Sequence, residues 1–317
     1  MKNTHLKDRI EEYLDYRRSL GYGMAYQDAM LRSFARFVAR RRFQGPLKRQ
    51  WVEEFVSAPQ GVNPAYYTSR HRVLYDFARY WAAFDPCVEI PAPRGPQVGY
   101  RRSQPYIYSG GEVQSLMEAA RRGAASRPLV GETLAAIIGL MACAGLRRGE
   151  AVNLRRDDVD LKHSILRVRR SKNRPLRLVP LQASAMAALQ DYAYQRDRAF
   201  PVPGTDHFFL NKLGGAMLAN DFTDNFRRIR QRAGIKSAGG RQPRAHDLRH
   251  TFACNCLVSW LREGRDVSRS AHLLATYLGH DGLKETYWYL SGIPALLELV
   301  GRRFEQYASA DLRGNQA

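Results

Sequence analysis

A stretch interrupted by prolines and glycines limits most strongly how this chain can fold. Residues 91–105 read PAPRGPQVGYRRSQP, with four prolines and two glycines. Proline lacks an amide hydrogen and has a fixed φ, so no regular helix or strand runs through such a stretch. We predict a linker here between two domains, residues 1–90 and residues 106–317. A chain of 317 residues is also longer than one ordinary domain.

Residues 1–90 are predicted to form an all-helical domain. Apolar side chains recur at helical spacing in LKDRIEEYLDYRRSLG, AMLRSFARFVARRR, WVEEFV and VLYDFARYWAAF. Gly21 is expected to end the first helix, and Asn63 and Pro64 supply a cap and a first-turn proline for the last. Four helices with short loops would make a small bundle with arginine-rich faces.

Residues 106–317 are predicted to be mainly α-helical with a small β-hairpin sheet, an α+β domain. Ser109 and Glu112 form a capping box, and ETLAAIIGLMACAG is apolar enough to be a buried helix that ends at Gly145. Two β-branched runs surround a polar turn in residues 164–180, which predicts the hairpin. Further helices are expected at residues 182–198, 220–233, 246–264, 271–280 and 293–308.

The charge of the chain indicates a polyanionic partner. Lysine and arginine number 50 against 30 aspartates and glutamates, a net charge of +20. Both predicted domains are basic, which favours nucleic acid over a single basic tail on a neutral protein. Solvated arginine-rich faces are the alternative explanation. Arginine outnumbers lysine, and its guanidinium binds phosphate oxygens in pairs.

Cysteine usage and hydropathy narrow the cellular setting. No run of eighteen or more apolar residues suggests a membrane span, and MKNTHLKDRIEEYLDY has no apolar signal-peptide region. The cysteines fit neither a disulfide framework nor a zinc site, and we expect all of them to be small buried residues: Cys87, Cys143, Cys254 and Cys256. These features predict a protein of the reducing cytoplasm that is not associated with a membrane.

Several polar residues could together serve one phosphate. His246 and Arg249 are three apart on a predicted helix and therefore share a face. Arg147 follows the glycine break after the buried helix, and Lys172 lies in the hairpin turn. His280 follows the end of a helix, which is a common capping choice. Each of these residues, taken singly, is typical of an ordinary surface side chain.

Their order along the chain carries more information. The segments GLRRGE, a hairpin with Ser-Lys followed by RLVPL, HDLRHTFA, LGH and then a tyrosine resemble the tyrosine recombinases, or phage-type integrases, over residues 106–308. Residues 1–90, with LDYRRSLGY, resemble the helical (SAM-like) core-binding domain of that family. We expect no separate arm-site domain before residue 1, so the chain resembles the simple recombinases more than the large phage integrases. Two features depart from the family pattern: Arg148 replaces a smaller residue, and RSKNRP replaces a glycine-rich turn, with Arg170 and Arg174 close to Lys172.

The resemblance implies a set of catalytic residues: Arg147, Lys172, His246, Arg249, His280 and the nucleophile Tyr289. It implies attack of the tyrosine on a DNA phosphodiester to give a 3′-phosphotyrosyl intermediate, without metal or ATP. The arginines would stabilise the charge that develops on the phosphate oxygens. His246 would accept the tyrosine proton, Lys172 would protonate the leaving 5′ oxygen, and His280 would bind a phosphate oxygen.

Two tyrosines compete for the role of nucleophile. Tyr287 and Tyr289 are separated by roughly 200° around a helix, so one cannot substitute for the other. Periodicity alone does not choose between them. The resemblance implies Tyr289, because the family places its nucleophile nine residues after the histidine that His280 matches. Asp281 and Gly282 supply the turn that lets His280 and Tyr289 meet. Tyr287 and Trp288 then become packing residues.

Double-stranded DNA is the partner that the resemblance implies, with assembly into a tetrameric synapse, alone or with other recombinases. The helix at residues 293–308 has an apolar stripe that would dock on its own domain or on a neighbouring protomer. The reaction could be integration, excision, resolution or transposition of mobile DNA. Two alternatives remain open: a catalytically silent DNA-binding accessory subunit of the same fold, and relaxation of DNA like that of a type IB topoisomerase.

Overall fold

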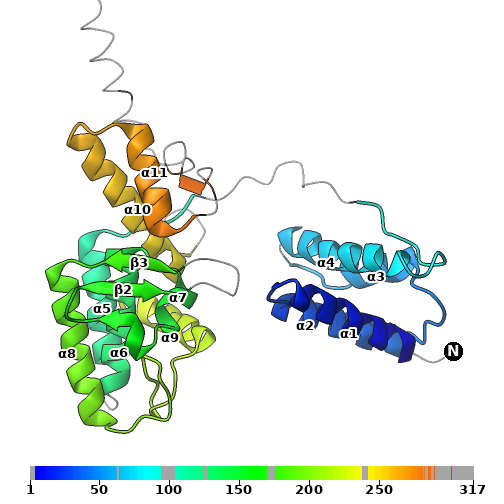
Figure 1. The fold of residues 1–317 in the computed structure, drawn as a ribbon, viewed down its shortest axis with the longest axis horizontal. Coiled ribbons are helices and arrows are strands. Elements are labelled where there is room, and N and C mark those ends of the chain that lie inside the picture. Colours follow the sequence, from blue (N-terminus) through cyan, green and yellow to red (C-terminus); the bar gives the residue numbers. More distant parts are fainter. Residues whose placement is uncertain are drawn as a thin grey trace, which may run out of the picture. The chain divides into compact units, whose positions relative to one another are not determined.

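The computed structural model describes residues 4–62, 64–93, 104–124, 128–169, 176–237 and 242–280, together with residues 282, 285, 286, 289 and 301. The chain divides into two compact units, an N-terminal one that includes residues 4–93 and a C-terminal one that includes residues 104–169 and 176–280 (Figure 1). The described residues are mostly helical with one small sheet, which confirms the predicted fold class. None of the described helices combines the length and the apolar character needed to cross a bilayer.

The N-terminal unit contains four helices that bury one face each. They are α1 (Thr4–Ser19), α2 (Ala25–Arg40), α3 (Arg49–Ser57) and α4 (Pro64–Ala82). Gly21 follows α1 in the left-handed region at φ 85°, and α4 begins at Pro64, as the sequence predicted. Leu14, Leu31 and Phe77 are completely or almost completely buried in the shared core. The apolar spacing therefore builds the predicted small bundle.

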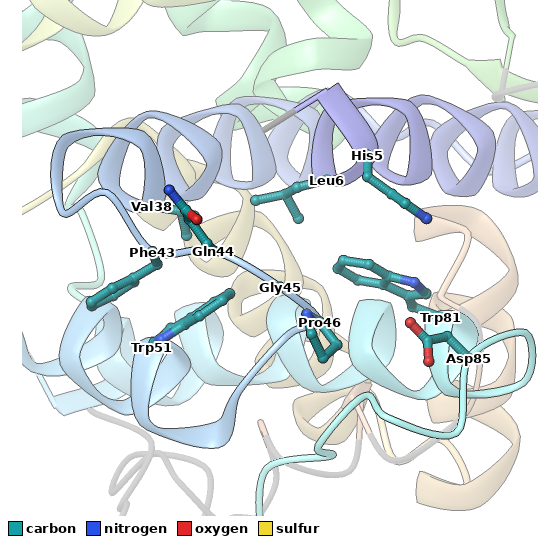
Figure 2. Close-up of a pocket in the computed structure, with 10 residues that line it drawn as sticks. All are labelled: His5, Leu6, Val38, Phe43, Gln44, Gly45, Pro46, Trp51, Trp81 and Asp85. Carbon is teal, nitrogen blue, oxygen red and sulfur yellow. The ribbon is translucent and has the colours of Figure 1, made fainter. Parts of the chain in front are cut away.

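A small pocket lies inside this N-terminal unit (Figure 2). Its volume is about 150 Å³. The rings of Phe43 and Trp51 stack along its wall with centroids 4.9 Å apart, and His5 and Asp85 also line it. The indole nitrogen of Trp81 is buried here without a hydrogen-bond partner among the described residues. None of the predicted site residues lines this pocket.

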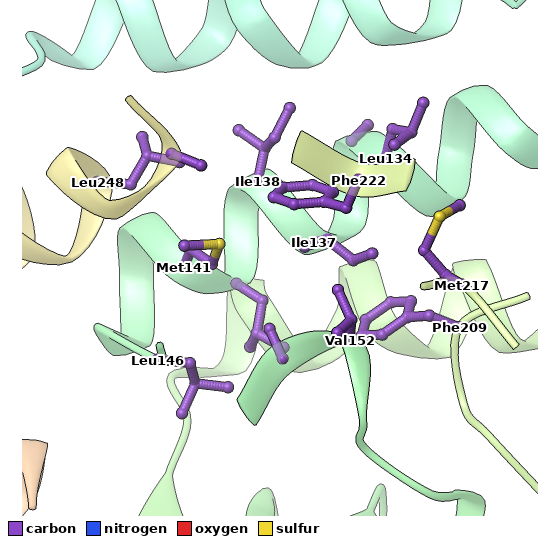
Figure 3. Packing of buried hydrophobic residues seen from close by; sticks show 14 of the residues in the cluster. Leu134, Ile137, Ile138, Met141, Leu146, Val152, Phe209, Met217, Phe222 and Leu248 are labelled. Carbon is purple, nitrogen blue, oxygen red and sulfur yellow. The ribbon is translucent and has the colours of Figure 1, made fainter. Parts of the chain in front are cut away.

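The C-terminal unit is organised around the apolar helix α6. Figure 3 shows Ile137, Ile138 and Met141 of α6 packed with Phe222 and Leu248, which come from two other helices. The elements of this unit are α5 (Gly110–Gly123), α6 (Pro128–Ala144), α7 (Arg148–Val152), the 3-10 turn η1 (Arg156–Asp158), β1 (Val159–Asp160), β2 (Ile165–Val168), β3 (Arg177–Pro180), α8 (Ala183–Ala199), α9 (Ala219–Arg232), α10 (Ala245–Arg262) and α11 (Val267–Leu278). The predicted capping box of Ser109 and Glu112 starts α5.

The predicted hairpin is present as β2 and β3, which pair antiparallel with Val168 opposite Arg177. The short strand β1, which the sequence pattern does not predict, pairs with β2 and completes the order β1-β2-β3. Lys172 and the rest of the hairpin turn, residues 170–175, lie outside the described residues. The register nevertheless places Arg177 at the turn end of β3.

Two further sequence predictions need comment. The expectation that all four cysteines are buried is wrong for Cys87 and Cys143, which are exposed, whereas Cys254 is buried and Cys256 is intermediate. Cys87 lies in the irregular segment after α4, and connecting segments of this kind run over the protein surface. The helix predicted at residues 293–308 falls almost entirely outside the described residues.

Candidate active site

The turn after α6 fixes the first arginine of the site. Gly145 has φ +60°, and a Cβ atom added there would lie 2.5 Å from Phe252 and 2.7 Å from Leu278. Only glycine fits both the left-handed conformation and the close packing. The chain then turns into α7, and Arg147 occupies the position just before that helix. A buried helix and a sterically restricted glycine therefore hold the backbone of Arg147 in place.

Arg147 is held by the residues around it. Its backbone N–H and its Nη1 each donate to the carboxylate of Glu150 at 2.9 Å. Its Nη2 donates to the carbonyl oxygen of Gly279, at the end of α11, at 3.1 Å. One third of the side chain remains exposed, at 33 %. The guanidinium is therefore oriented by the protein and still accessible to an anion.

Arg249 is buried on α10, with 2 % of its surface exposed. It donates to the carbonyl oxygen of Gly145 at 2.7 Å and to that of Leu278 at 3.0 Å. Burial and the nearby charge of Arg147 lower the pKa of Arg249 to about 10, so the guanidinium stays protonated at neutral pH. A fixed positive charge is thus held beneath the turn that carries Arg147.

A carboxylate lies among three arginines of the site. The Oε2 atom of Glu150 accepts a hydrogen bond from Arg177 at 3.0 Å and lies 3.9 Å from Nη1 of Arg249. Burial raises the pKa of Glu150, but the hydrogen bond from the Arg147 backbone and the charge of Arg177 outweigh it, and the net effect lowers that pKa. Glu150 is therefore ionised and offsets part of the repulsion among the arginines.

His246 borders the site as a neutral imidazole. Burial and the charge of Arg249 lower the pKa of His246 to about 4. At neutral pH the ring can therefore donate one hydrogen bond and accept another. It meets the ring of His250 edge to face, with centroids 4.7 Å apart. His246 and His250 are four residues apart on α10 and so lie on one face.

Tyr289 lies against this face of α10. Its ring is 2 % exposed and packs in a small apolar cluster with Leu257, Leu274 and Leu278. Its hydroxyl forms a hydrogen bond of 2.7 Å with Nδ1 of His250. This hydrogen bond joins Tyr289 to α10, the helix that also carries His246 and Arg249.

His280 follows the helix end that Gly279 closes in the left-handed conformation, at φ 65°. Its side chain is 3 % exposed, and its Nδ1 atom forms a hydrogen bond of 2.7 Å with Thr286. Its ring stacks on that of Tyr289 with centroids 6.4 Å apart. The two residues therefore meet despite the nine residues between them.

The structure thus brings five of the six predicted residues together: Arg147, His246, Arg249, His280 and Tyr289. The sixth, Lys172, and the competing Tyr287 with its neighbour Trp288 lie outside the described residues.

Three further residues of the site were not singled out from the sequence. The sequence does contain an indication of Glu150, because it stands three residues after Arg147, the spacing of a capping box. The indication of His250 is weaker: it lies one helical turn after His246 and therefore shares its helix face. Arg177 had none beyond its place in RLVPL, because its partners Glu150 and Leu278 are distant in sequence.

A basic cleft of about 540 Å³ opens beside the site. Arg147 and His246 form one end of its lining, and four more arginines join them: Arg148, Arg227, Arg230 and Arg244. Arg148 donates to Thr223, and the buried Arg230 donates to the carbonyl of Pro243 at 2.8 Å. The lining matches an extended chain of phosphates better than a small neutral ligand. In the part of the chain that the structure describes, no cluster of three His, Cys, Asp or Glu side chains could hold a metal ion.

Comparison with known proteins places this arrangement in a family. The model of the phage integrase family matches residues 109–292. The chain is 39 % identical over 298 residues to a putative integrase/recombinase, y4rE, of Sinorhizobium fredii, covering 94 % of this chain and 95 % of the relative. It is 30 % identical over 226 residues to tyrosine recombinase XerC of Chlamydia trachomatis serovar L2, covering 70 % and 66 % of the two chains.

Solved structures share the fold at low sequence identity. The Tn1549 transposon integrase in complex with transposon right end DNA has a TM-score of 0.64 at 16 % identity, covering 95 % of this chain and 99 % of that one. The XerH recombinase bound to difH substrate has a TM-score of 0.61 at 18 % identity, covering 95 % and 84 %. The family match and the two sequence relatives establish that this chain belongs to the phage integrase family and is a tyrosine recombinase, an enzyme of site-specific DNA recombination.

Proposed function

We propose that this recombinase cleaves DNA by attack of the Tyr289 hydroxyl on a phosphodiester, which leaves a 3′-phosphotyrosyl link and a free 5′-hydroxyl. One observation carries the proposal: His280 stacks on the Tyr289 ring, and Arg147 and Arg249 donate to the carbonyl oxygens of Gly279 and Leu278, the two residues that come just before His280. The covalent link conserves the energy of the broken bond, so the strands can be rejoined without ATP.

The arginines supply the electrostatic part of the mechanism. Negative charge grows on the non-bridging phosphate oxygens as the tyrosine attacks. Arg147 is one third exposed and can donate directly to these oxygens, while Arg249 adds a fixed charge from beneath. Because both guanidiniums are already oriented by backbone carbonyls, little reorganisation is required in the transition state. They fill the role that a metal ion has in other phosphoryl-transfer enzymes, and we propose that none is needed here.

Lys172, His246 and His280 complete the proposed mechanism. In this proposal Lys172 protonates the leaving 5′ oxygen. His280 donates to a phosphate oxygen, which its position against the Tyr289 ring supports. The pKa of about 4 keeps His246 neutral, so it can bind a phosphate oxygen or take up a proton at the edge of the cleft.

The basic cleft is the proposed track for the DNA backbone beside the scissile phosphate. Arg148, Arg227 and Arg244 would contact neighbouring phosphates and fix the position of the duplex. The relatives with solved structures are held on transposon-end and difH DNA, which supports duplex DNA as the substrate. We further propose that protomers assemble into a tetrameric synapse, alone or with other recombinases, and act on mobile DNA in the cytoplasm, at the nucleoid.

A trapped covalent adduct tests the proposal. A footprint on DNA flanking the gene would first locate the binding site. A suicide substrate nicked next to the cleavage position would then release the short strand that carries the 5′-hydroxyl. Religation would be prevented, and the enzyme would stay covalently attached to the DNA. We expect the adduct with the wild type and with Tyr287→Phe, in the presence of EDTA, and none with Tyr289→Phe. An adduct that survives Tyr289→Phe, or that EDTA abolishes, contradicts the mechanism. Relaxation of supercoiled DNA without a specific site would instead favour a topoisomerase.

A further inference from the structure

We infer that His250 takes the proton from the Tyr289 hydroxyl during cleavage and returns it during religation. The inference rests on the proposed role of Tyr289 as nucleophile and adds a group that touches the reacting oxygen. His250 belongs to the HDLRH segment, in which the other histidine, His246, is the one expected from the family pattern.

The geometry at the tyrosine oxygen carries the inference. Nδ1 of His250 lies 2.7 Å from the Tyr289 hydroxyl, a normal hydrogen-bond distance. The ring centroids are 5.5 Å apart and the ring planes are tilted by 60°. Both side chains are buried, at 5 % and 2 % exposed. In the tautomer that carries its proton on Nε2, His250 is an acceptor already in place for a proton leaving the tyrosine.

The two histidines of α10 face different parts of the site. His246 lines the basic cleft together with Arg147, on the side where the phosphate would lie. His250 is one helical turn further along and contacts the tyrosine oxygen. Their rings touch edge to face at 4.7 Å. We therefore assign the two histidines different roles: His246 contacts the phosphate, and His250 exchanges a proton with the nucleophile Tyr289.

The proposed step balances as follows. Neutral His250 accepts the phenol hydrogen bond through its Nδ1 lone pair. The O–H bond of Tyr289 breaks as its oxygen bonds to phosphorus, and the proton becomes the second N–H of an imidazolium. The bond from phosphorus to the 5′ oxygen breaks, and a separate acid protonates that oxygen. In religation the 5′-hydroxyl attacks phosphorus and returns its proton to the group that acted as the separate acid. The bond from phosphorus to the tyrosine oxygen breaks, and imidazolium His250 protonates that oxygen.

Chemistry explains why an acceptor is needed here. A tyrosine hydroxyl ordinarily has a pKa of about 10 and an imidazole one of about 6.5. Full transfer before attack is therefore unfavourable, whereas transfer that accompanies formation of the P–O bond is not. A positioned acceptor of this kind typically contributes about 10²–10⁴-fold to a rate.

Two synthetic substrates distinguish the proton transfer out of the Tyr289 hydroxyl from the other steps of the reaction. In the first, sulfur replaces the bridging 5′ oxygen, so the leaving group needs no acid. We expect His250→Ala to cleave ordinary suicide DNA more slowly than the wild type by a factor of about 10² or more. The substrate with the bridging sulfur should not restore the cleavage rate of this variant. Lys172→Ala, a comparison for the acid step, should be rescued by sulfur. His272→Ala, an exposed histidine on α11, is the matched control and should resemble the wild type.

The second substrate carries 3′-p-nitrophenyl phosphate in place of the tyrosyl link. A strand with a 5′-hydroxyl displaces p-nitrophenolate, which leaves without protonation, and Tyr289 takes no part. We expect His250→Ala to join this substrate at nearly the rate of the wild type. His250→Asn, which retains a hydrogen-bonding group near the position of Nδ1 but cannot take a proton, should behave like His250→Ala in both assays.

Three outcomes overturn the inference. Wild-type cleavage by His250→Ala would show that the contact has no role. Equal slowing with the p-nitrophenyl substrate would show that His250 only supports the structure. Recovery of cleavage by His250→Asn would reduce its role to holding the tyrosine in place. Failure of the wild type to form any adduct would instead overturn the function proposed for Tyr289, and is distinguishable from these three.

Discussion

The side chain of Arg177 donates a hydrogen bond of 3.0 Å to the carboxylate of Glu150, and this contact ties β3 to the turn that carries Arg147. The two side chains are 9 % and 11 % exposed. A second bond from Arg177 to the carbonyl of Leu278 extends the link to the end of α11. Through these two contacts, Arg177 joins the hairpin to the turn that carries Arg147 and to the end of α11, just before His280.

We predict that Glu150→Gln destabilises the protein by about 3 kcal/mol, since removing one partner of a buried ion pair leaves the other uncompensated. Here Arg147, Arg177 and Arg249 would lose their shared anion. Urea unfolding at neutral pH measures the loss. Glu118→Gln is the control, because its pair with Arg122 is largely exposed and should contribute less than about 1 kcal/mol. Equal effects of the two substitutions would contradict the assigned role of Glu150.

We predict that Arg249→Lys reduces adduct formation by at least about 10²-fold, a typical effect of removing one fixed donor from a transition state. A lysine has a single ammonium and cannot span the carbonyls of Gly145 and Leu278 as the guanidinium fork does. Single-turnover cleavage of the suicide substrate measures the rate. A lysine variant that cleaves at the rate of the wild type would show that only the charge matters.

The neutral state of His246 predicts a stability that depends on pH. The folded-state pKa of about 4 lies below the unfolded value of about 6.5, so the unfolded chain binds the proton first as pH falls. Stability linked to His246 is therefore fully present above pH 6.5 and is lost progressively down to pH 4. Because the side chain of His246 is exposed to the cleft, solvent screens part of this effect, and His246→Gln should abolish a loss of less than about 1 kcal/mol between pH 6.5 and pH 5, as measured by urea unfolding. Parallel pH profiles for the two proteins would contradict the lowered pKa of His246.

Local patterns in the sequence predicted much of this architecture. Helical spacing placed His246 and Arg249 on one face, and glycine breaks located the turns at Gly145 and Gly279. These features depend on residues close together in the chain, where periodicity and capping rules apply. The order of the motifs then identified Tyr289, whose position no local rule could select.

The parts that the sequence did not disclose depend on contacts between distant residues. Arg177 finds Glu150 from 27 residues away, and His250 meets Tyr289 from 39 residues away. Neither pair follows from helical or strand spacing, because each needs the packed arrangement of α7, β3, α10 and α11. The error on Cys87 and Cys143 has a similar origin, since average burial of a residue type ignores local surroundings.

The basic cleft predicts which surface arginines bind DNA. Arg227 is 64 % exposed beside Asp224 and lines the cleft. We expect Arg227→Gln to weaken duplex binding whatever the sequence and to lower the slope of log K against log salt by about one, the loss of one phosphate contact. Binding titrations at several salt concentrations measure this slope. Arg122→Gln is the matched control and should leave the slope unchanged. Arg122 lies 3.6 Å from the carboxylate of Glu118, the same distance as Arg227 from Asp224, but it does not line the cleft.

The last prediction concerns the glycine beneath Arg147. Gly145→Ala should destabilise the protein by more than about 2 kcal/mol, because a side chain there meets Phe252 and Leu278 and also has to adopt a positive φ. The carbonyl of Gly145 would move away from Arg249, so adduct formation should fall with stability. Gly149→Ala is the matched control: it lies in α7, has open space around its Cβ position, and should change the unfolding free energy by less than about 1 kcal/mol, in the stabilising direction. If Gly145→Ala unfolds and cleaves like Gly149→Ala, the turn does not fix Arg147 as the packing around Gly145 indicates.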